Sequence, residues 1–189
     1  MYITYSQPKL KKDWNERIRR LWSIITTRST PDLWIKVFIL RNKKYKLSDG
    51  KEHEFLTDSV NGHYRCATVN GHGFYDSEWD YLREHKKINH CITLKIGENC
   101  DDERIARLMI HEYRHYLQWK KYGANSMRQK VNGKRKRPIQ VERDAKKYTE
   151  KRINELIGNR LIKYKSIEWS GMYHANVRYA MENWFEEVR

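Results

Sequence analysis

The chain has 189 residues and a formal net charge of +15, with 39 Lys and Arg residues against 24 Asp and Glu. This length suits one domain with its own core, and the 13% aromatic content argues against a disordered chain. The 39% of residues that are apolar form no run approaching the roughly 20 that a membrane-spanning helix needs.

The first part of the chain predicts one amphipathic helix followed by short strands. Residues 9–28 place apolar side chains at helical spacing on one face. These side chains are Trp14, Ile18, Leu21, Trp22 and Ile25. Leu33–Leu40 is rich in β-branched and aromatic residues, which favours a buried strand. Turn-forming pairs such as Asn61-Gly62 indicate a meander of short strands over residues 41–75.

A further strand and a long helix are expected next. Ile88–Ile96 alternates loosely between apolar and polar residues and predicts a strand. Asp101 begins an acidic run that suits the first turn of a helix, because negative charge stabilises that end. This helix should run to about Tyr122 and end at Gly123.

The last part of the chain predicts a basic loop and two more helices. The loop covers residues 124–137, and Pro138 is suited to the first position of a helix that runs to about Ile157. A final helix is expected over Tyr173–Val188. The order of helix, strands and helices predicts an α+β fold, formed as a single domain over residues 1–189.

The chemistry of the chain is indicated by His111-Glu112-Tyr113-Arg114-His115, an HExxH motif inside a predicted helix. A spacing of four residues places both imidazoles on one helix face, one turn apart, where they can bind one metal ion. Glu112 is then suited to be the general base toward a metal-activated water, whose pKa zinc lowers to about 7. The alternative interpretation is a structural helix with two hydrogen-bonded histidines and an ion-paired glutamate.

A catalytic zinc site usually has three protein ligands, and the next predicted helix offers a third. Glu142 begins a stripe that continues along the expected core face through Ala145, Thr149, Ile153 and Leu156. A carboxylate in that position points inward, and the small Ala145 lets the two helices approach closely. Asp144 is the competing ligand, about 200° from Glu142 around the helix. Glu142 could also serve only to balance nearby basic residues.

These two helices resemble a known group of enzymes. HEYRH in one helix and E-x-D-A-x-x-Y in the next resemble the minigluzincins, small zinc metallopeptidases with glutamate as third ligand, and among them the ImmA/IrrE-like peptidases. Glu142, Ala145 and Tyr148 match the second motif, and Thr149 stands where that pattern has alanine. More distantly, HEYRHYLQW is similar to the SprT-like peptidases, which usually take a histidine as third ligand. The resemblance covers roughly residues 88–157.

The resemblance implies a zinc-dependent metalloendopeptidase that hydrolyses peptide bonds in a peptide or protein substrate. It implies one zinc ion held by His111, His115 and Glu142, with Glu112 as the catalytic general base. It also implies a small twisted antiparallel or mixed sheet packed on the HExxH helix and the following ligand-bearing helix.

One further role follows from the same resemblance, and another is open by residue type alone. An edge strand antiparallel to the substrate is expected over the active-site helix, and Ile88–Ile96 is in place to be that strand and to pair with extended peptide. Tyr148 and His174 are candidates, by residue type alone, to stabilise an oxyanion beside the metal.

Most of the excess charge is concentrated near the predicted site. Residues 120–165 contain sixteen Lys and Arg against four acidic residues, a net charge of +12. Four of these lie in the loop between the ligand-bearing helices: Lys134, Arg135, Lys136 and Arg137. They could contact a nucleic-acid backbone or an acidic partner, or form a solvated loop. The charge is therefore also consistent with a second function, in which the chain is a basic nucleic-acid-binding protein with a structural or vestigial zinc site.

The cysteines and the N-terminus indicate the cellular compartment in which the protein is expected. Cys66, Cys91 and Cys100 form no CxxC pair, and Met1 is not followed by a signal-peptide pattern. We therefore expect free thiols, a cytoplasmic location and no membrane partner.

Overall fold

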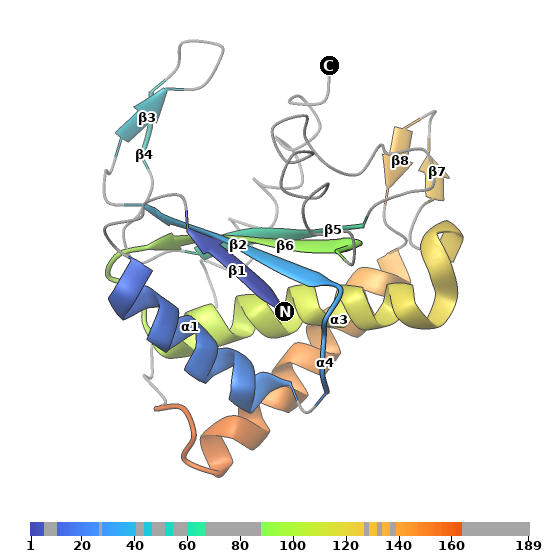
Figure 1. Ribbon diagram of the computed structural model, residues 1–189. Coiled ribbons are helices and arrows are strands. Elements are labelled where there is room, and N and C mark those ends of the chain that lie inside the picture. Colours follow the sequence, from blue (N-terminus) through green and yellow to red (C-terminus); the bar gives the residue numbers. More distant parts are fainter. Residues whose placement is uncertain are drawn as a thin grey trace.

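The computed structural model describes residues 1–5, 11–26, 28–40, 44–46, 52–54, 60–66, 88–126, 129–131, 134–136 and 139–163. The fold of these residues is α+β, as predicted, with a mixed four-stranded sheet and three helices (Figure 1). The elements are β1 (Tyr2–Tyr5), α1 (Lys11–Ile25), β2 (Leu33–Leu40), β3 (Lys44–Lys46), β4 (Glu52–Glu54), β5 (Val60–Cys66), β6 (His90–Gly97), α3 (Asp102–Ser126), β7 (Gln129–Val131), β8 (Lys134–Lys136) and α4 (Ile139–Gly158). No helix in these ranges combines the length and the apolar character needed to cross a membrane.

The sheet has the strand order β1-β2-β6-β5. β1 and β2 are parallel and are joined through α1, as a parallel pair requires a crossover connection. β2 is also parallel to β6, whereas β5 runs antiparallel to β6 along its whole length. Figure 1 shows α1, α3 and α4 together on one side of this sheet.

The core lies between the sheet and the helices. Alternate residues of neighbouring strands face this core. In the register of β2 and β6, Ile35 pairs with Ile92 and Val37 with Leu94, and all four belong to the core. On α1, four of the five apolar side chains expected on one face are buried, and Trp14 packs against them. α3 contacts β5, β6, α1 and α4, which makes it the central helix of the fold.

Several expected elements are confirmed. The strand at Leu33–Leu40 and the helices that we expected to begin near residues 9, 101 and 138 are all present, with ends shifted by a few residues. The structure adds β1, which the sequence analysis did not predict. Residues 41–75 contain β3, β4 and β5 as expected, although β5 pairs with β6 rather than with the strand before it. The helix expected over Tyr173–Val188 lies outside the described residues.

Two expectations were wrong. The predicted loop over residues 124–137 contains β7 and β8, which pair as a small antiparallel hairpin. The strand that we expected over Ile88–Ile96, now β6, is not an edge strand, because β2 and β5 hydrogen-bond to its two sides. Its backbone is therefore already paired, and among the described strands β5 is the antiparallel edge of the sheet.

The sequence of α3 explains where the helix begins and where its helical geometry is interrupted. Asp101 caps the first turn, since its Oδ1 accepts a hydrogen bond of 2.9 Å from the backbone N–H of Arg104. Asp102 is ion-paired with Arg17 and Arg20, which fixes the start of α3 to α1. Near the other end, Gly123 has a φ of 72°, a left-handed conformation that interrupts the helical geometry where the sequence predicted its end.

A buried polar cluster joins α3 to the strands. Asp32, just before β2, accepts hydrogen bonds from Tyr116 at 2.8 Å and Lys120 at 3.0 Å. Nε2 of His90 lies 3.4 Å from the same carboxylate, and its Nδ1 lies 2.8 Å from the hydroxyl of Tyr64. Burial lowers the pKa of His90 from 6.5 to about 4, although the charge of Asp32 opposes this shift. The imidazole is therefore neutral at physiological pH.

This cluster predicts a loss of stability in mild acid. Between pH 6.5 and 4 the unfolded chain binds a proton at His90 that the folded chain does not, so the free energy of unfolding should fall as the pH falls. The full effect is about 3 kcal/mol at pH 4 and absent above pH 7. Urea denaturation at several pH values should show this slope in the wild type and a shallower one in His90→Phe. Parallel pH profiles would contradict the assignment to His90.

Candidate metal centre

The HExxH residues lie in the middle of α3, where the helix is regular and held on several sides. His111 and His115 stand one turn apart, and their Nε2 atoms lie 3.1 Å from each other. The side chain of His115 is fully buried, whereas that of His111 is 20% exposed. The pair therefore presents two ring nitrogens toward one point that is accessible from one side.

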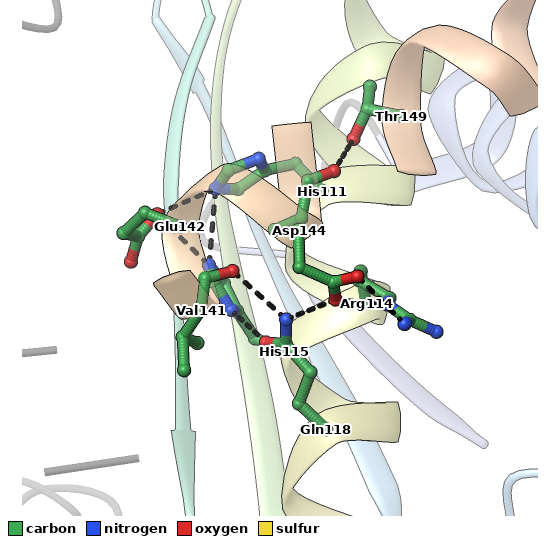
Figure 2. A network of polar contacts seen from close by, with 9 residues as sticks. His111, Arg114, His115, Gln118, Val141, Glu142, Asp144 and Thr149 are labelled. Carbon is green, nitrogen blue, oxygen red and sulfur yellow. Dashed lines mark hydrogen bonds and ion pairs between the residues drawn. The ribbon is translucent and has the colours of Figure 1, made fainter. Parts of the chain in front are cut away.

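Glu142 joins the two histidines from the first turn of α4 (Figure 2). Its Oε2 lies 3.4 Å from Nε2 of His111 and 3.4 Å from Nε2 of His115. These three side chains form a group that could hold a metal ion. The stripe that pointed to Glu142 is also present, because Ala145, Thr149, Ile153 and Leu156 are all buried. The small side chain of Ala145 lies in the packed contact between α4 and α3, one turn after Glu142.

Asp144, the competing ligand, has other partners. Arg114 donates to both of its carboxylate oxygens, at 2.8 and 3.1 Å, and Nε2 of Gln118 donates at 2.7 Å. The hydrogen bonds from Arg114 keep the pKa of Asp144 below its ordinary value, so the carboxylate is ionised at neutral pH. Asp144 therefore fixes α4 against α3, beside the three converging side chains (Figure 2).

Gln118 is a residue of the site that the sequence analysis missed. Its amide nitrogen faces two acceptors, the carbonyl of Val141 at 2.9 Å and Asp144, which leaves its oxygen to face Nδ1 of His115 at 2.8 Å. Since an amide oxygen only accepts, the proton of His115 must be on Nδ1. Nε2 of His115 then carries the lone pair that a metal ion needs. Gln118 thus sets the tautomer of one candidate ligand and holds the start of the helix that carries another.

This arrangement predicts that Gln118 affects metal binding without touching the metal. Partners of this kind typically contribute 10–100-fold to metal affinity. We expect Gln118→Met, which keeps the length of the side chain but no hydrogen bonds, to bind metal about 10–100-fold more weakly. Competition with a chromophoric chelator measures this, with the exposed Gln140→Met as control. An unchanged affinity in Gln118→Met would show that the hydrogen bond to His115 has no such role.

Glu112 is buried beside the pair, with 4% of its surface exposed. On the helix it lies about 60° from His115, which places both on neighbouring parts of one face. Its Oε2 is fully buried and has no hydrogen-bond partner among the described residues. A buried carboxylate oxygen in that state is costly unless another group binds it, which is what a site for a water or a ligand would provide.

Of the remaining predicted residues, only the side chain of Tyr148 is among those that the structure describes, and it is not part of this group. Tyr148 lies under the guanidinium of Arg114, 4.7 Å from ring centre to carbon, on a different side of α4 from Glu142. His174 and Arg137 lie outside the described residues. Lys134, Arg135 and Lys136 form β8, a strand whose side chains the structure does not describe.

Comparisons with protein-family models, with curated proteins and with solved structures found no match to this chain. The interpretation of the site therefore depends on its own residues and their geometry.

Proposed function

We propose that this chain is a zinc-dependent metalloendopeptidase. The observation that carries the proposal is the convergence of two histidine nitrogens and one carboxylate oxygen, 3.1–3.4 Å apart, beside a buried glutamate. Two histidines and a glutamate are a known ligand set of catalytic zinc, which leaves a fourth position open. Calcium and magnesium prefer oxygen ligands, so two imidazoles argue against them.

The spacing of the three atoms supports zinc. Zinc binds nitrogen and oxygen at about 2.0–2.2 Å in tetrahedral geometry, which separates two ligand atoms by about 3.3–3.6 Å. The three separations in this site are 3.1, 3.4 and 3.4 Å. The side chains therefore need only small adjustments to share one ion.

Zinc bound there supplies Lewis-acid chemistry, since it lowers the pKa of water toward 7 and polarises a carbonyl. Glu112 accepts the proton of the attacking water on its buried carboxylate and donates it to the nitrogen of the departing amine. His115 stays in one tautomer because Gln118 holds the proton on Nδ1. His111 and Glu142, on the more exposed side, border the path by which a substrate would enter.

The sheet offers a place for the substrate backbone. β5 is the antiparallel edge of the sheet and lies against α3, so an extended peptide can add to it as a further strand. Gly62 in β5 packs closely on α3, because a Cβ there would lie 3.0 Å from the side chain of Leu108. The same Cβ would lie 2.6 Å from the carbonyl of Thr93 in the neighbouring strand β6. Leu108 is three residues before His111. The proposed substrate strand therefore lies beside the start of the HExxH motif.

Metal content and proteolysis test the proposal together. Protein purified without chelator is expected to contain one zinc ion per chain and to cleave fluorescently labelled, unfolded casein. Phenanthroline should abolish the cleavage, and added zinc should restore it. Protein that binds no zinc, or that binds zinc and cleaves no peptide in a broad peptide library, would overturn the proposal.

A further inference from the structure

A basic groove lies on the helical side of the molecule, separate from the proposed zinc ligands. It has a volume of about 710 Å³ and is lined by residues from the end of α1, the second half of α3 and the middle of α4. Six of these residues are cationic: Arg28, Arg114, Lys120, Lys121, Lys151 and Arg152. Among the described residues that line it, the only acidic side chain is Glu155. The groove is therefore lined by more cationic than acidic side chains.

Three of these six cations already have acidic partners within the fold. Lys120 is paired with Asp32 at 3.0 Å, and Arg152 with Glu155 at 2.8 Å. Arg114 is held by Asp144. Within the described part of the chain, Arg28, Lys121 and Lys151 take part in no ion pair, and all three are exposed. Lys121 lies over the ring of Tyr122, 4.8 Å from its centre. Arg28 and Lys151 are therefore the cations most available to a bound anion.

The floor of the groove is apolar and aromatic. Leu117 and Tyr148, both half-buried, line it together with the cations, and the buried Tyr113 lies beneath them. The ring of Tyr148 stacks on the guanidinium of Arg114. A surface that serves only for solubility has no need of such a floor. Proteins that bind single-stranded nucleic acid combine a basic groove for the phosphates with flat side chains for the bases.

We infer that this groove binds a short segment of single-stranded nucleic acid, with Arg28 and Lys151 on the phosphates and the partly exposed Tyr148 against a base. From Tyr113 to Lys121 the groove follows α3 for about 12 Å, enough for a few nucleotides. A nucleic acid carries a phosphate and a flat base in every nucleotide, which an acidic peptide does not, and an intact duplex keeps its bases stacked inside. The inference does not depend on the proposed peptidase activity, because the groove includes none of the zinc ligands.

Binding of a fluorescein-labelled dT strand of about 20 nucleotides, followed by anisotropy at several salt concentrations, tests this inference. The variant Arg28→Gln/Lys151→Gln removes two exposed cations and leaves the core untouched. Each lost phosphate contact lowers the salt dependence by about 0.7, so the slope should fall by about 1.4 and the affinity at 0.1 M salt by at least tenfold. The control Arg19→Gln/Lys95→Gln loses the same net charge from exposed residues outside the groove and should bind as the wild type does.

Three results would overturn the inference. The first is wild-type affinity in the groove variant, and the second is an equal loss in the control, which would mean that only net charge matters. The third is competition by polyglutamate as strong as that by an unlabelled dT strand, which would make the groove a site for acidic protein. The same measurements on Glu112→Gln should give wild-type binding, so a failure of the peptidase proposal leaves this test intact.

Discussion

Glu112→Gln is expected to bind one zinc ion per chain, like the wild type, and to cleave peptide about 10²–10⁴-fold more slowly. The proposed ligand atoms belong to other residues, so the amide should leave the proposed zinc site complete. Gln has nearly the same shape as Glu, but it cannot accept a proton, and proton transfer by a positioned base contributes about this much to a rate. Elemental analysis and initial rates on one peptide substrate measure the two quantities.

The matched control is Glu16→Gln, which makes the same chemical change at an exposed position of α1. It should keep both the metal and the activity. Wild-type turnover in Glu112→Gln would contradict the assignment of the base. Loss of zinc from the same variant would instead make Glu112 a ligand and require a different arrangement of the site.

Replacing Glu142 by Ala is expected to weaken zinc binding by more than the 10–100-fold that is typical of residues outside the coordination sphere. Glu142 supplies the single negative charge of the ligand group, and its oxygen lies 3.4 Å from both histidine nitrogens. Asp144→Ala removes a carboxylate two residues away, on the same helix turn. It should change zinc affinity less than tenfold, because Gln118 keeps its hydrogen bonds to His115 and Val141.

The comparison of these two variants decides between the ligands that the sequence left open. Asp144→Ala has a structural effect of its own, since it leaves Arg114 without its carboxylate partner and should lower the stability of the protein. Zinc affinity, measured by chelator competition under conditions where both variants are folded by circular dichroism, separates binding from stability. A larger loss of affinity in Asp144→Ala than in Glu142→Ala would assign the third ligand to Asp144.

The parts of the site that the sequence predicted are those that depend on helix periodicity. The four-residue spacing of His111 and His115 fixes their relative direction on any regular helix. The apolar stripe that begins at Glu142 similarly reports which side of α4 faces the core, and the structure confirms it. Such patterns are local, so they can be recognised before any tertiary contact is known.

The parts that the sequence did not predict depend on contacts between distant segments. Nothing in Ile88–Ile96 shows that β5 will pair with its second side, which turns an expected edge strand into an interior one. β1 is only four residues long and is fixed by its pairing with β2. The role of Gln118 could have been predicted from the sequence, because Gln118 lies three residues after His115 on the same helix face and is a polar side chain on a buried stripe. The partners of its amide, Val141 and Asp144, belong to another helix.

The structure shows where part of the basic charge of the chain lies. The sequence placed a net +12 within residues 120–165 and drew attention to Lys134–Arg137. The structure adds Arg28, from the other end of the chain, to a groove that α3 and α4 line with Tyr113 and Tyr148. Charge that is spread along the sequence is thus partly gathered at one place by the packing of α1 against α3.

X-ray absorption at the zinc edge, on protein loaded with one equivalent of the metal, tests whether His111, His115 and Glu142 share one zinc ion. We expect a first shell of nitrogen and oxygen at about 2.0–2.2 Å, with the outer scattering of two imidazole rings. Sulfur at about 2.3 Å, from cysteines such as Cys91 or Cys100, or a shell without imidazole, would contradict it.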